Sequence, residues 1–382
     1  MIYLDNAASA PVNPKASEAA MPFLTGNYAN PSSIHTLGRE AYLAVTAARE
    51  QCAAALGARP DEIYFTSGGT ESDNLAVFSA IGNNPRKCKI VTTEIEHPAV
   101  LNAVHQAEKS GCEVALISPD KNGIVSVESI AAAIDDNTAL VSVMAANNEI
   151  GTIQPISDIG AICRERGVLF HVDAVQAVGN IPIDVREINA DYVSVSAHKI
   201  GGFKGSGLLF ARKNAPLSPM VFGGGQERGI RSGTENATGI VALGVAIEDI
   251  TANIKKRAEK IARLRDLLIG ELETIPDSRL NGSRTERLCG NVNFSFKGID
   301  GETLVLNLDL FGVCASSASA CCAGKQTVSH VLRAIDVPDD YIRGSLRLTL
   351  SEHNTEKEVT AAVGIIRSCV ERLRENNGTK PF

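Results

Sequence analysis

Up to about residue 240, the hydrophobic pattern alternates between short apolar runs and longer amphipathic stretches. The short runs are rich in β-branched and aromatic residues, which is typical of buried strands, and the longer stretches have helical spacing. Strands that alternate with helices predict an α/β fold with a mostly parallel sheet covered on both faces. The predicted strands are Glu62–Phe65, Lys89–Thr92, Leu140–Val143, Leu169–Val172, Tyr192–Val195 and Leu208–Phe210, and the predicted helices include Glu40–Leu56, Pro98–Ser110 and Ser157–Arg166.

The pattern changes after residue 240. Residues 240–275 predict one long amphipathic helix, followed by strands at Asn291–Phe296 and Leu346–Leu350 and a last helix over Glu356–Glu375. Strands without regular helical crossovers indicate a smaller α+β domain. We therefore expect a large domain over residues 15–255 and a small domain made of residues 1–14 and 256–382, with the long helix as the link.

Composition narrows the classes of partner. The chain has 382 residues and a formal net charge of −7, which argues against nucleic acid as the main partner because phosphate binding needs a basic face. No stretch reaches the roughly 18 unbroken apolar residues of a membrane span. The start of the chain also lacks a signal-peptide pattern, so we expect a cytoplasmic protein that does not engage a membrane.

Cysteine usage predicts reduced, mostly buried thiols. The nine cysteines form no short-spaced framework, and an odd number does not fit a complete set of disulfides. No pair has the spacing of a zinc site, so we expect no bound metal.

Polar loops follow the predicted strands. The carboxyl ends of parallel strands meet at one edge of a sheet, where such folds bind ligands. We therefore expect these loops to form one site. They are Thr66–Thr70, Glu94–His97, Asn147–Glu149, Asp173–Gln176 and Ser196–Lys199.

The first of these loops has features of an anion site. Gly68 and Gly69 allow backbone N–H groups to approach an anion, and the N-terminus of the following helix favours negative charge. The hydroxyls of Ser67 and Thr70 add donors. The alternative is a tight turn in which Thr70 is the helix N-cap.

Three other strand-end residues suggest a cofactor with a pyridine ring. Lys199 follows a buried strand and is either a solvated cap or a desolvated Schiff-base lysine. Asp173 is placed to keep a pyridine nitrogen protonated, which makes the ring an electron sink. His97 is either a structural histidine or a group that lies on that ring and exchanges protons.

The loops described above, together with several other segments, follow one another along the chain in a characteristic order. In that order they resemble the group I cysteine desulfurases of the class V aminotransferase family, which use pyridoxal phosphate to take sulfur from L-cysteine. The resemblance runs from residue 2 to about residue 360. The segments that carry it are Tyr3–Ala8, Asn30–His35, Thr66–Asn74, Glu96–Pro98, Asn147–Thr152, His171–Gln176, Ser196–Gly205, Gly223–Thr234 and Ser316–Cys321.

The resemblance implies a fold-type-I architecture for pyridoxal-phosphate enzymes and a role for each matching residue. Lys199 is implied to form the Schiff base, Asp173 to pair with the ring nitrogen, Gln176 to bond the ring hydroxyl and His97 to stack on the ring. The phosphate is assigned to Gly69, Thr70, Ser196 and His198, with Thr234 reaching in from the second subunit of a homodimer, and the cofactor oxygen and substrate carboxylate are assigned to Asn148, Arg347 and Asn30.

Two loops depart from the family pattern. The run after the lysine is Gly202-Phe203-Lys204-Gly205, where the family commonly has proline in place of Phe203. Because proline restricts φ, we expect a looser loop here. In the cysteine loop, relatives usually have glycine in place of Ala318 and threonine or serine in place of Cys322, so we expect a stiffer loop.

By the resemblance, Cys321 is the catalytic thiol. It lies in a run of small residues, which predicts an exposed, mobile loop suited to carrying sulfur. Cys314 is expected to be a packing residue. Cys322 either shares the persulfide or replaces threonine without consequence, and a disulfide between Cys321 and Cys322 is not expected.

The implied reaction converts L-cysteine to L-alanine and leaves a persulfide on Cys321. That sulfur then passes to an acceptor such as an iron–sulfur scaffold protein or a tRNA-thiolation relay, and Cys321 transiently shares a cluster with such an acceptor. The alternatives are a selenocysteine lyase or an aminotransferase on the same fold, and a catalytically silent homologue that binds partners.

Overall fold

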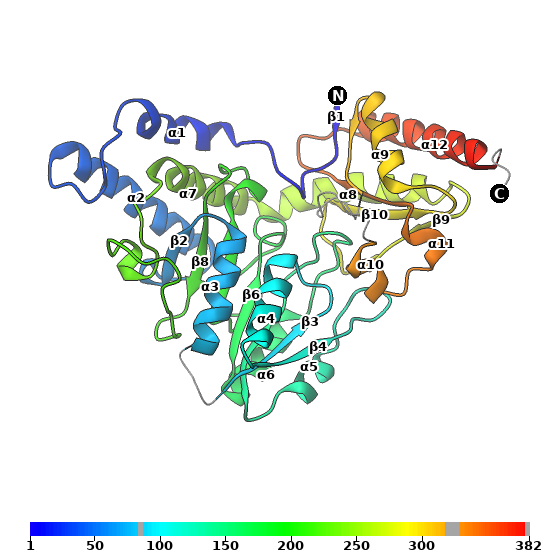
Figure 1. Cartoon of the computed structure of the whole chain (residues 1–382). Helices are drawn as coiled ribbons and strands as arrows, with labels where there is room; N and C mark the ends of the chain where they lie inside the picture. Colours follow the sequence, from blue (N-terminus) through cyan, green and yellow to red (C-terminus); the bar gives the residue numbers. More distant parts are fainter. Residues whose placement is uncertain (83–86, 318–327, 379–382) are drawn as a thin grey trace.

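The computed structural model describes residues 1–82, 87–317 and 328–378. In these residues seven strands form one sheet, in the order β2-β8-β7-β6-β5-β3-β4. All pairings between β7 and β4 are parallel, and β8 runs antiparallel to both of its neighbours, so the prediction of a mostly parallel sheet is confirmed (Figure 1). The strands are β2 (Ile63–Thr66), β3 (Lys89–Thr93), β4 (Glu113–Ile117), β5 (Thr138–Ser142), β6 (Leu169–Asp173), β7 (Tyr192–Ser196) and β8 (Gly207–Ala211).

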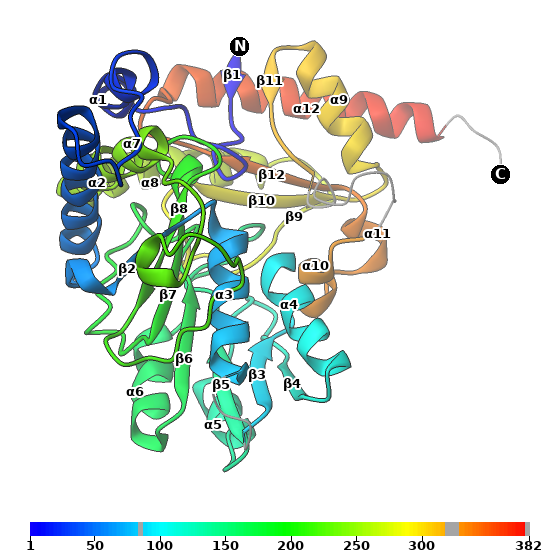
Figure 2. The same ribbon diagram turned by 60° about the vertical axis from the view of Figure 1, so that its left-hand side comes forward.

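Both faces of this sheet are buried. In β5, Leu140 belongs to an apolar cluster with residues of α3 and α4, whereas its neighbour Val141 belongs to a cluster with residues of α2 and α6. Burial on both faces explains why the strands read as unbroken apolar runs. Figure 2 shows α3 and α4 on one side of the sheet and α6 on the other. The helices of this region are α1 (Pro14–Thr25), α2 (Thr36–Ala55), α3 (Gly69–Gly82), α4 (Pro98–Lys109), α5 (Val127–Ala133) and α6 (Ile156–Arg166).

The single helix predicted over residues 240–275 is wrong. The structure has two helices, α7 (Ala237–Ala252) and α8 (Ile254–Leu272), which meet at an angle of 75°. Asn253 separates them with φ −130° and ψ 35°, outside the helical region. In the described residues no single helix has the length and apolarity of a membrane span, although this bent pair meets both criteria when taken together.

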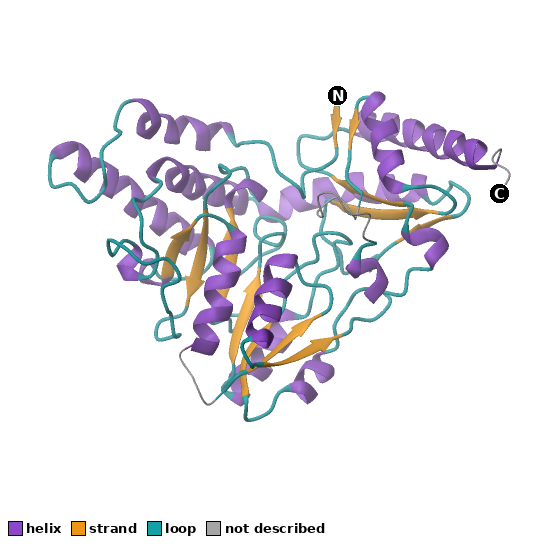
Figure 3. Ribbon diagram, viewed as in Figure 1, coloured by secondary structure: helices purple, strands orange, loops and turns teal. Residues whose placement is uncertain are grey.

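A second, smaller sheet lies beside the first region (Figure 3). Its strands pair antiparallel in the order β12-β10-β9, and a separate parallel pair joins β1 to β11. An apolar cluster of its own packs these strands against α8, α9 and α12, and it includes Leu4. The remaining elements are β1 (Ile2–Tyr3), β9 (Ser278–Leu280), β10 (Asn291–Phe296), α9 (Gly301–Leu310), β11 (Val313–Cys314), α10 (His330–Ala334), α11 (Asp339–Ile342), β12 (Ser345–Thr349) and α12 (Glu356–Gly378).

The prediction that the cysteines are reduced is wrong for Cys88 and Cys112, which form a disulfide. Cys88 precedes β3 and Cys112 precedes β4, and the parallel pairing of these strands brings the two Cα atoms to 4.7 Å. Cys52, Cys163 and Cys369 are free and buried, as expected for small apolar residues.

The loop after Lys199 is held by packing. Phe203 packs against a cluster of alanines from α1 and α7, and its carbonyl accepts a hydrogen bond from the Ser206 hydroxyl at 2.9 Å. An aromatic ring thus anchors the loop that the absence of proline at position 203 predicts to be looser.

Candidate functional site

The predicted site loops lie at one edge of the large sheet. β2 and β7 both run antiparallel to β8, so they run in the same direction as β3, β5 and β6. The loops that follow these strands therefore leave the sheet at the same edge, as the sequence predicted. The segments after β2 and β7 are in close contact, because a Cβ added to Gly69 would lie 3.7 Å from Cβ of Ser196.

The loop after β2 leads directly into α3. Gly68 has φ 152°, a conformation that favours glycine, and α3 begins at Gly69. Gly69 also packs closely, since an added Cβ would lie 2.6 Å from Cγ2 of Val175. Thr70 is exposed and lies inside the first turn of α3, so it is not the N-cap that the alternative reading proposed. Backbone N–H groups, a helix N-terminus and the buried Ser196 hydroxyl together form a surface suited to an anion.

Asp173 ends β6 and is 5% exposed. Its Oδ1 accepts a hydrogen bond from the backbone N–H of Val175 at 2.9 Å. Burial raises the pKa of Asp173, and the charge of Asp73 raises it further. A buried carboxylate with few donors is stabilised by a cation placed next to it.

His171 precedes Asp173 by two residues in β6, and its ring lies between two serine hydroxyls of the neighbouring strands. Its Nδ1 is 2.8 Å from the Ser142 hydroxyl and its Nε2 is 3.0 Å from the Ser194 hydroxyl. Burial lowers the pKa of His171 to about 4, so the ring is neutral at physiological pH. Burial also raises the pKa of Asp73, whose Oδ1 lies 3.5 Å from Nε2 of His171, to about 7.

Lys199 closes a short 3-10 turn that begins at Ala197, directly after β7. Its Nζ donates to the carbonyl oxygens of Ala7 at 2.6 Å and Ala8 at 2.9 Å. The Gln176 side chain donates to the same Ala7 carbonyl at 3.0 Å, so one backbone oxygen joins two predicted cofactor ligands. Tyr3–Ala8 was one of the segments that carry the family resemblance, but nothing in it indicated a role for this carbonyl, because backbone contacts leave no residue-type signal.

His198 and His97 lie beside the lysine. Burial, followed by the charge of Lys199, lowers the pKa of His198 to about 4. Burial is also the largest cause of the lowered pKa of His97, where the charges of Asp173 and Lys199 act in opposite directions. His97 is the N-cap of α4, and its Nδ1 accepts from the backbone N–H of Ala99 at 3.1 Å. The neutral His97 ring therefore carries its proton on Nε2.

Glu96 precedes His97 and is fully buried. Its Oε1 accepts hydrogen bonds from the Thr93 hydroxyl at 2.7 Å and from the Met144 backbone at 3.0 Å, and burial raises its pKa to about 8. Burial thus favours the protonated form of Glu96, a property that the motif did not predict.

Arg347 and Asn148 are in contact, and their roles toward cofactor and substrate stay predictions. Arg347, in β12, is 6% exposed and donates through Nη1 to the Asn148 carbonyl at 3.1 Å. Its Nη2 forms an ion pair with Asp5 at 3.0 Å, a contact that the sequence did not indicate. The Nε atom is buried and has no hydrogen-bond partner in the described part of the chain. The Nε–H group of this guanidinium is therefore an unfilled donor.

The predicted catalytic Cys321 lies outside the described residues, as do Ala318 and Cys322. The described residues on either side are attached to the site. Ser316 forms an isolated antiparallel bridge with Arg347. The Ser329 hydroxyl donates to Oε2 of the buried Glu149 at 2.6 Å, and burial raises the pKa of Glu149.

Two residues that were predicted to belong to the site, Asn30 and Thr234, lie in loops other than the strand-end loops. Asn30 is exposed in the loop between α1 and α2, where its Oδ1 accepts from the backbone N–H of Ser32. Thr234 is exposed in the loop before α7. In the described residues, no hydrogen bond joins either residue to the strand-end loops.

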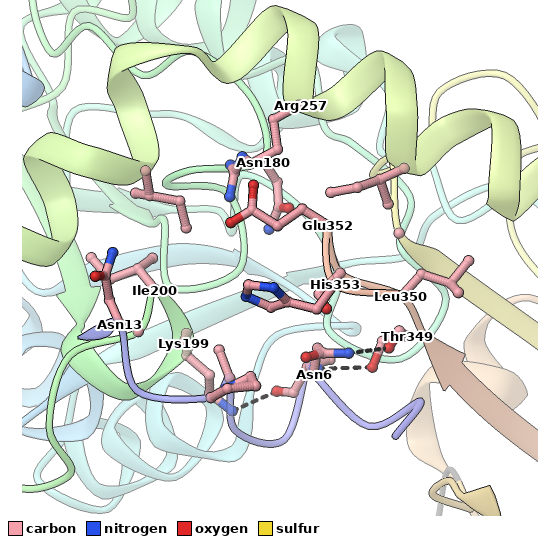
Figure 4. Close-up of a pocket in the computed structure, with 18 of the residues that line it drawn as sticks. Asn6, Asn13, Asn180, Lys199, Ile200, Arg257, Thr349, Leu350, Glu352 and His353 are labelled. Atoms are coloured by element: carbon pink, nitrogen blue, oxygen red, sulfur yellow. Dashed lines mark hydrogen bonds between the residues drawn. The ribbon is translucent and has the colours of Figure 1, made fainter. Parts of the chain in front are cut away.

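A cavity of about 450 Å³ reaches Lys199 from between the two sheets (Figure 4). Lys199 and Gln176 line it together with Asn6 and Ala7. The other predicted cofactor ligands do not line it, so the cavity extends away from the anion-binding loop.

Three comparisons place this geometry among known proteins. A family model described as aminotransferase class-V matches residues 2–361. Cysteine desulfurase IscS of Methanosarcina thermophila is 46% identical over 381 residues, which cover 100% of this chain and 94% of that protein. The structure of a NifS-like protein has a TM-score of 0.92 at 37% identity, covering 97% of this chain and 100% of the other. A structure of SspA in complex with cysteine has a TM-score of 0.82 at 36% identity, covering 93% and 100%.

Proposed function

This chain belongs to the class-V aminotransferase family and is a cysteine desulfurase, and we propose that it uses pyridoxal phosphate on Lys199 and the thiol of Cys321. The observation with most weight for the site is that the strand-end segments carrying Lys199, Asp173 and His97 all lie at the same edge of the large sheet. The buried Arg347 lies in the neighbouring small sheet, and its Nε is free to bind a further group.

The residues at the sheet edge fit the cofactor. The raised pKa of the buried Asp173 favours a protonated ring nitrogen as its neighbour. Gly68, Gly69 and Ser196 form a close-packed turn at a helix N-terminus, which suits a phosphate. When bound, pyridoxal phosphate supplies an electron sink that acidifies the α-proton of an amino acid.

Lys199 is proposed to hold the cofactor and then to move the α-proton. Its Nζ lies against the carbonyl oxygens of Ala7 and Ala8, which orient the amine. The low pKa of the nearby His198 keeps a second positive charge away from the lysine at physiological pH. His97, neutral with its proton on Nε2, is proposed to exchange protons with the substrate thiol.

Arg347 is proposed to bind the carboxylate of L-cysteine. A hydrogen bond from a guanidinium N–H to a carboxylate oxygen is charge-assisted and therefore stronger than one between neutral groups. Asp5 and the Asn148 carbonyl hold the Arg347 plane in place and leave Nε for the substrate.

Cys321 is proposed to accept the sulfur. The Cys321 thiolate attacks the substrate sulfur, a new S–S bond forms, the substrate C–S bond breaks, and a proton replaces sulfur on the carbon. L-cysteine and the thiol therefore become L-alanine and a persulfide, with all atoms accounted for. The neighbouring anchors, Ser316 on Arg347 and Ser329 on Glu149, support this role because they attach both sides of the cysteine segment to the substrate site.

We further propose a cytoplasmic homodimer in which Thr234 of one subunit reaches the phosphate of the other. The two apolar clusters support a division into residues 15–255 and residues 1–14 with 256–382. The acceptor is proposed to be an iron–sulfur scaffold or a tRNA-thiolation relay.

The test is to incubate the protein with L-cysteine and to measure alanine, keto acid and persulfide. We expect equal amounts of alanine and transferred sulfur, and loss of both in Cys321→Ala with the cofactor absorption unchanged. Cys314→Ala is the matched control, because Cys314 lies in β11 and pairs with β1. Full turnover by Cys321→Ala, or keto acid as the main product, would refute the assignment, and a higher rate on selenocysteine would make the enzyme a selenocysteine lyase.

A further inference from the structure

The cavity that reaches Lys199 has a second end that the proposed reaction does not use. This end is formed by α7, α8 and the loop that follows β12, and Arg257, Asp249 and Glu352 line it. Figure 4 shows Arg257, Asn180 and Glu352 on the side of the cavity opposite Lys199 and Asn6. Arg347 and Asn148 do not line the cavity, so this end is separate from the proposed site for the substrate carboxylate.

Arg257 is a cation with unfilled donors. Its Nε and Nη2 atoms are buried, and neither has a hydrogen-bond partner among the described residues. Burial is the largest cause of a lowered pKa at Arg257. Buried donors without partners are unfavourable, and a carboxylate is the group that best satisfies two guanidinium N–H groups.

The acidic side chains at this end differ in their availability. Asp249 is already engaged, because it accepts from Lys15 at 2.5 Å and from Asn13 at 2.7 Å. Glu352 is exposed, and its side chain forms no hydrogen bond or ion pair with the described residues. Its charge raises the pKa of Arg257, so the two groups are near each other without forming an ion pair. The cavity therefore presents one unpaired cation and one unpaired anion.

Apolar side chains supply part of the cavity lining. Ile261, Leu288 and Leu350 are each at most 5% exposed and line the cavity. Ile250 adds to this lining from α7. The whole cavity, from Lys199 to this end, has a volume of about 450 Å³, which is within the usual range of a small-molecule site.

We propose that this end of the cavity binds a free amino acid with an apolar side chain, held as a zwitterion. Arg257 binds the carboxylate, Glu352 binds the ammonium group, and the side chain packs on Ile250, Ile261 and Leu350. The inference does not depend on sulfur chemistry at Cys321 or on the cofactor at Lys199.

The experiment is equilibrium dialysis of labelled L-leucine against the purified, cofactor-loaded protein, before and after borohydride reduction. Reduction blocks covalent reaction of the probe at Lys199. Two further probes carry one charge each: 4-methylpentanoate lacks the ammonium group and isopentylamine lacks the carboxylate. We expect leucine to bind, and both single-charge probes to bind roughly ten- to a hundredfold more weakly, because each loses a charge-assisted contact.

Variants place the binding site. We expect Arg257→Gln and Glu352→Gln each to weaken leucine binding by a similar factor, whereas Arg263→Gln, an exposed arginine on the same helix, leaves it unchanged. Glu352 is exposed, so its variant remains informative if Arg257→Gln does not fold.

Three results would overturn the proposal: no leucine binding, equal binding of 4-methylpentanoate, or loss of binding in Arg347→Gln but not in Arg257→Gln. If borohydride does not attach the cofactor to Lys199, the proposed cofactor role fails, and the dialysis on unreduced protein still tests this site.

Discussion

Ser316 and Arg347 are joined by two backbone hydrogen bonds, one in each direction. The Ser316 N–H donates to the Arg347 carbonyl at 3.1 Å, and the Arg347 N–H donates to the Ser316 carbonyl at 2.7 Å. Cys321 is five residues further along the chain, and a fully extended chain of that length spans at most ~18 Å. The residue proposed to bind the substrate and the thiol proposed to attack it are therefore tethered to each other.

Replacing Arg347 tests the substrate role. We expect Arg347→Gln to lower kcat/KM for L-cysteine roughly ten- to a hundredfold, because a charge-assisted hydrogen bond to the substrate is lost. Asp5→Asn is expected to have a smaller effect, since it removes only the partner that orients the guanidinium. Steady-state kinetics with alanine detection decide the point, and an unchanged kcat/KM in Arg347→Gln would contradict the role.

Replacing Lys199 tests the attachment of the cofactor. We expect Lys199→Ala to lose the stable link that borohydride forms between protein and pyridoxal phosphate, and to lose activity. Lys204→Ala is the matched control, because Lys204 is exposed five residues further on. Mass spectrometry of the reduced protein gives the answer, and a cofactor adduct on another lysine would show that the assignment is wrong.

Glu96 predicts a pH dependence of stability. Its folded pKa of about 8 lies above the ordinary value of 4.5, so the folded chain binds the proton more tightly than the unfolded chain. Between pH 4.5 and 8 the wild-type free energy of unfolding therefore loses a contribution as pH rises, on the order of 1 kcal/mol per pH unit. Glu96→Gln removes this dependence. The difference in free energy of unfolding between variant and wild type should therefore shift in favour of the variant as pH rises from 4.5 to 8.

Chemical denaturation at several pH values measures this difference. The exposed Glu50→Gln is the control and should run parallel to wild type. Parallel curves for Glu96→Gln would mean that Glu96 is ionised throughout.

The disulfide between Cys88 and Cys112 predicts a thiol count. Among the described residues Cys88 and Cys112 are bridged and five cysteines are free, and no disulfide between Cys321 and Cys322 is expected. Seven of the nine thiols in the sequence should therefore react in denaturant without reductant, and nine after reduction. The bridge closes a loop with a sequence separation of 24, which corresponds to a stabilisation of about 3.5 kcal/mol in the chain-entropy model. Cys112→Ser should lose about this much, whereas nine reactive thiols in the unreduced protein would exclude the bridge.

The sequence predicted the parts of the fold whose signal is local. The apolar runs marked six strands of the large sheet, and their polar loops marked the site edge. β4 was missed because it lies at the edge of the sheet, where its residues are only partly buried. The break at Asn253 was missed because the apolar pattern of α7 and α8 continues across it.

Contacts between distant segments were the part that sequence could not supply. The ion pair of Asp5 with Arg347 and the carbonyl of Ala7 beside Lys199 join residues that are far apart in the chain. Such contacts depend on how two sheets pack, and no periodicity records them. Cys321, the residue with the most direct proposed role, was identified by the resemblance alone.

The N-terminal residues are synthesised first, but the segments that they pack against are synthesised near the end of translation. Leu4 is fully buried among residues of α8, α9 and α12, and β1 pairs with β11 at Val313. At ribosomal rates of about 5–20 residues per second, the N-terminal segment emerges roughly 15–60 s before that partner strand exists. Apolar side chains of this segment are thus exposed during synthesis, and the carbonyls that orient Lys199 take their places only when translation is nearly complete.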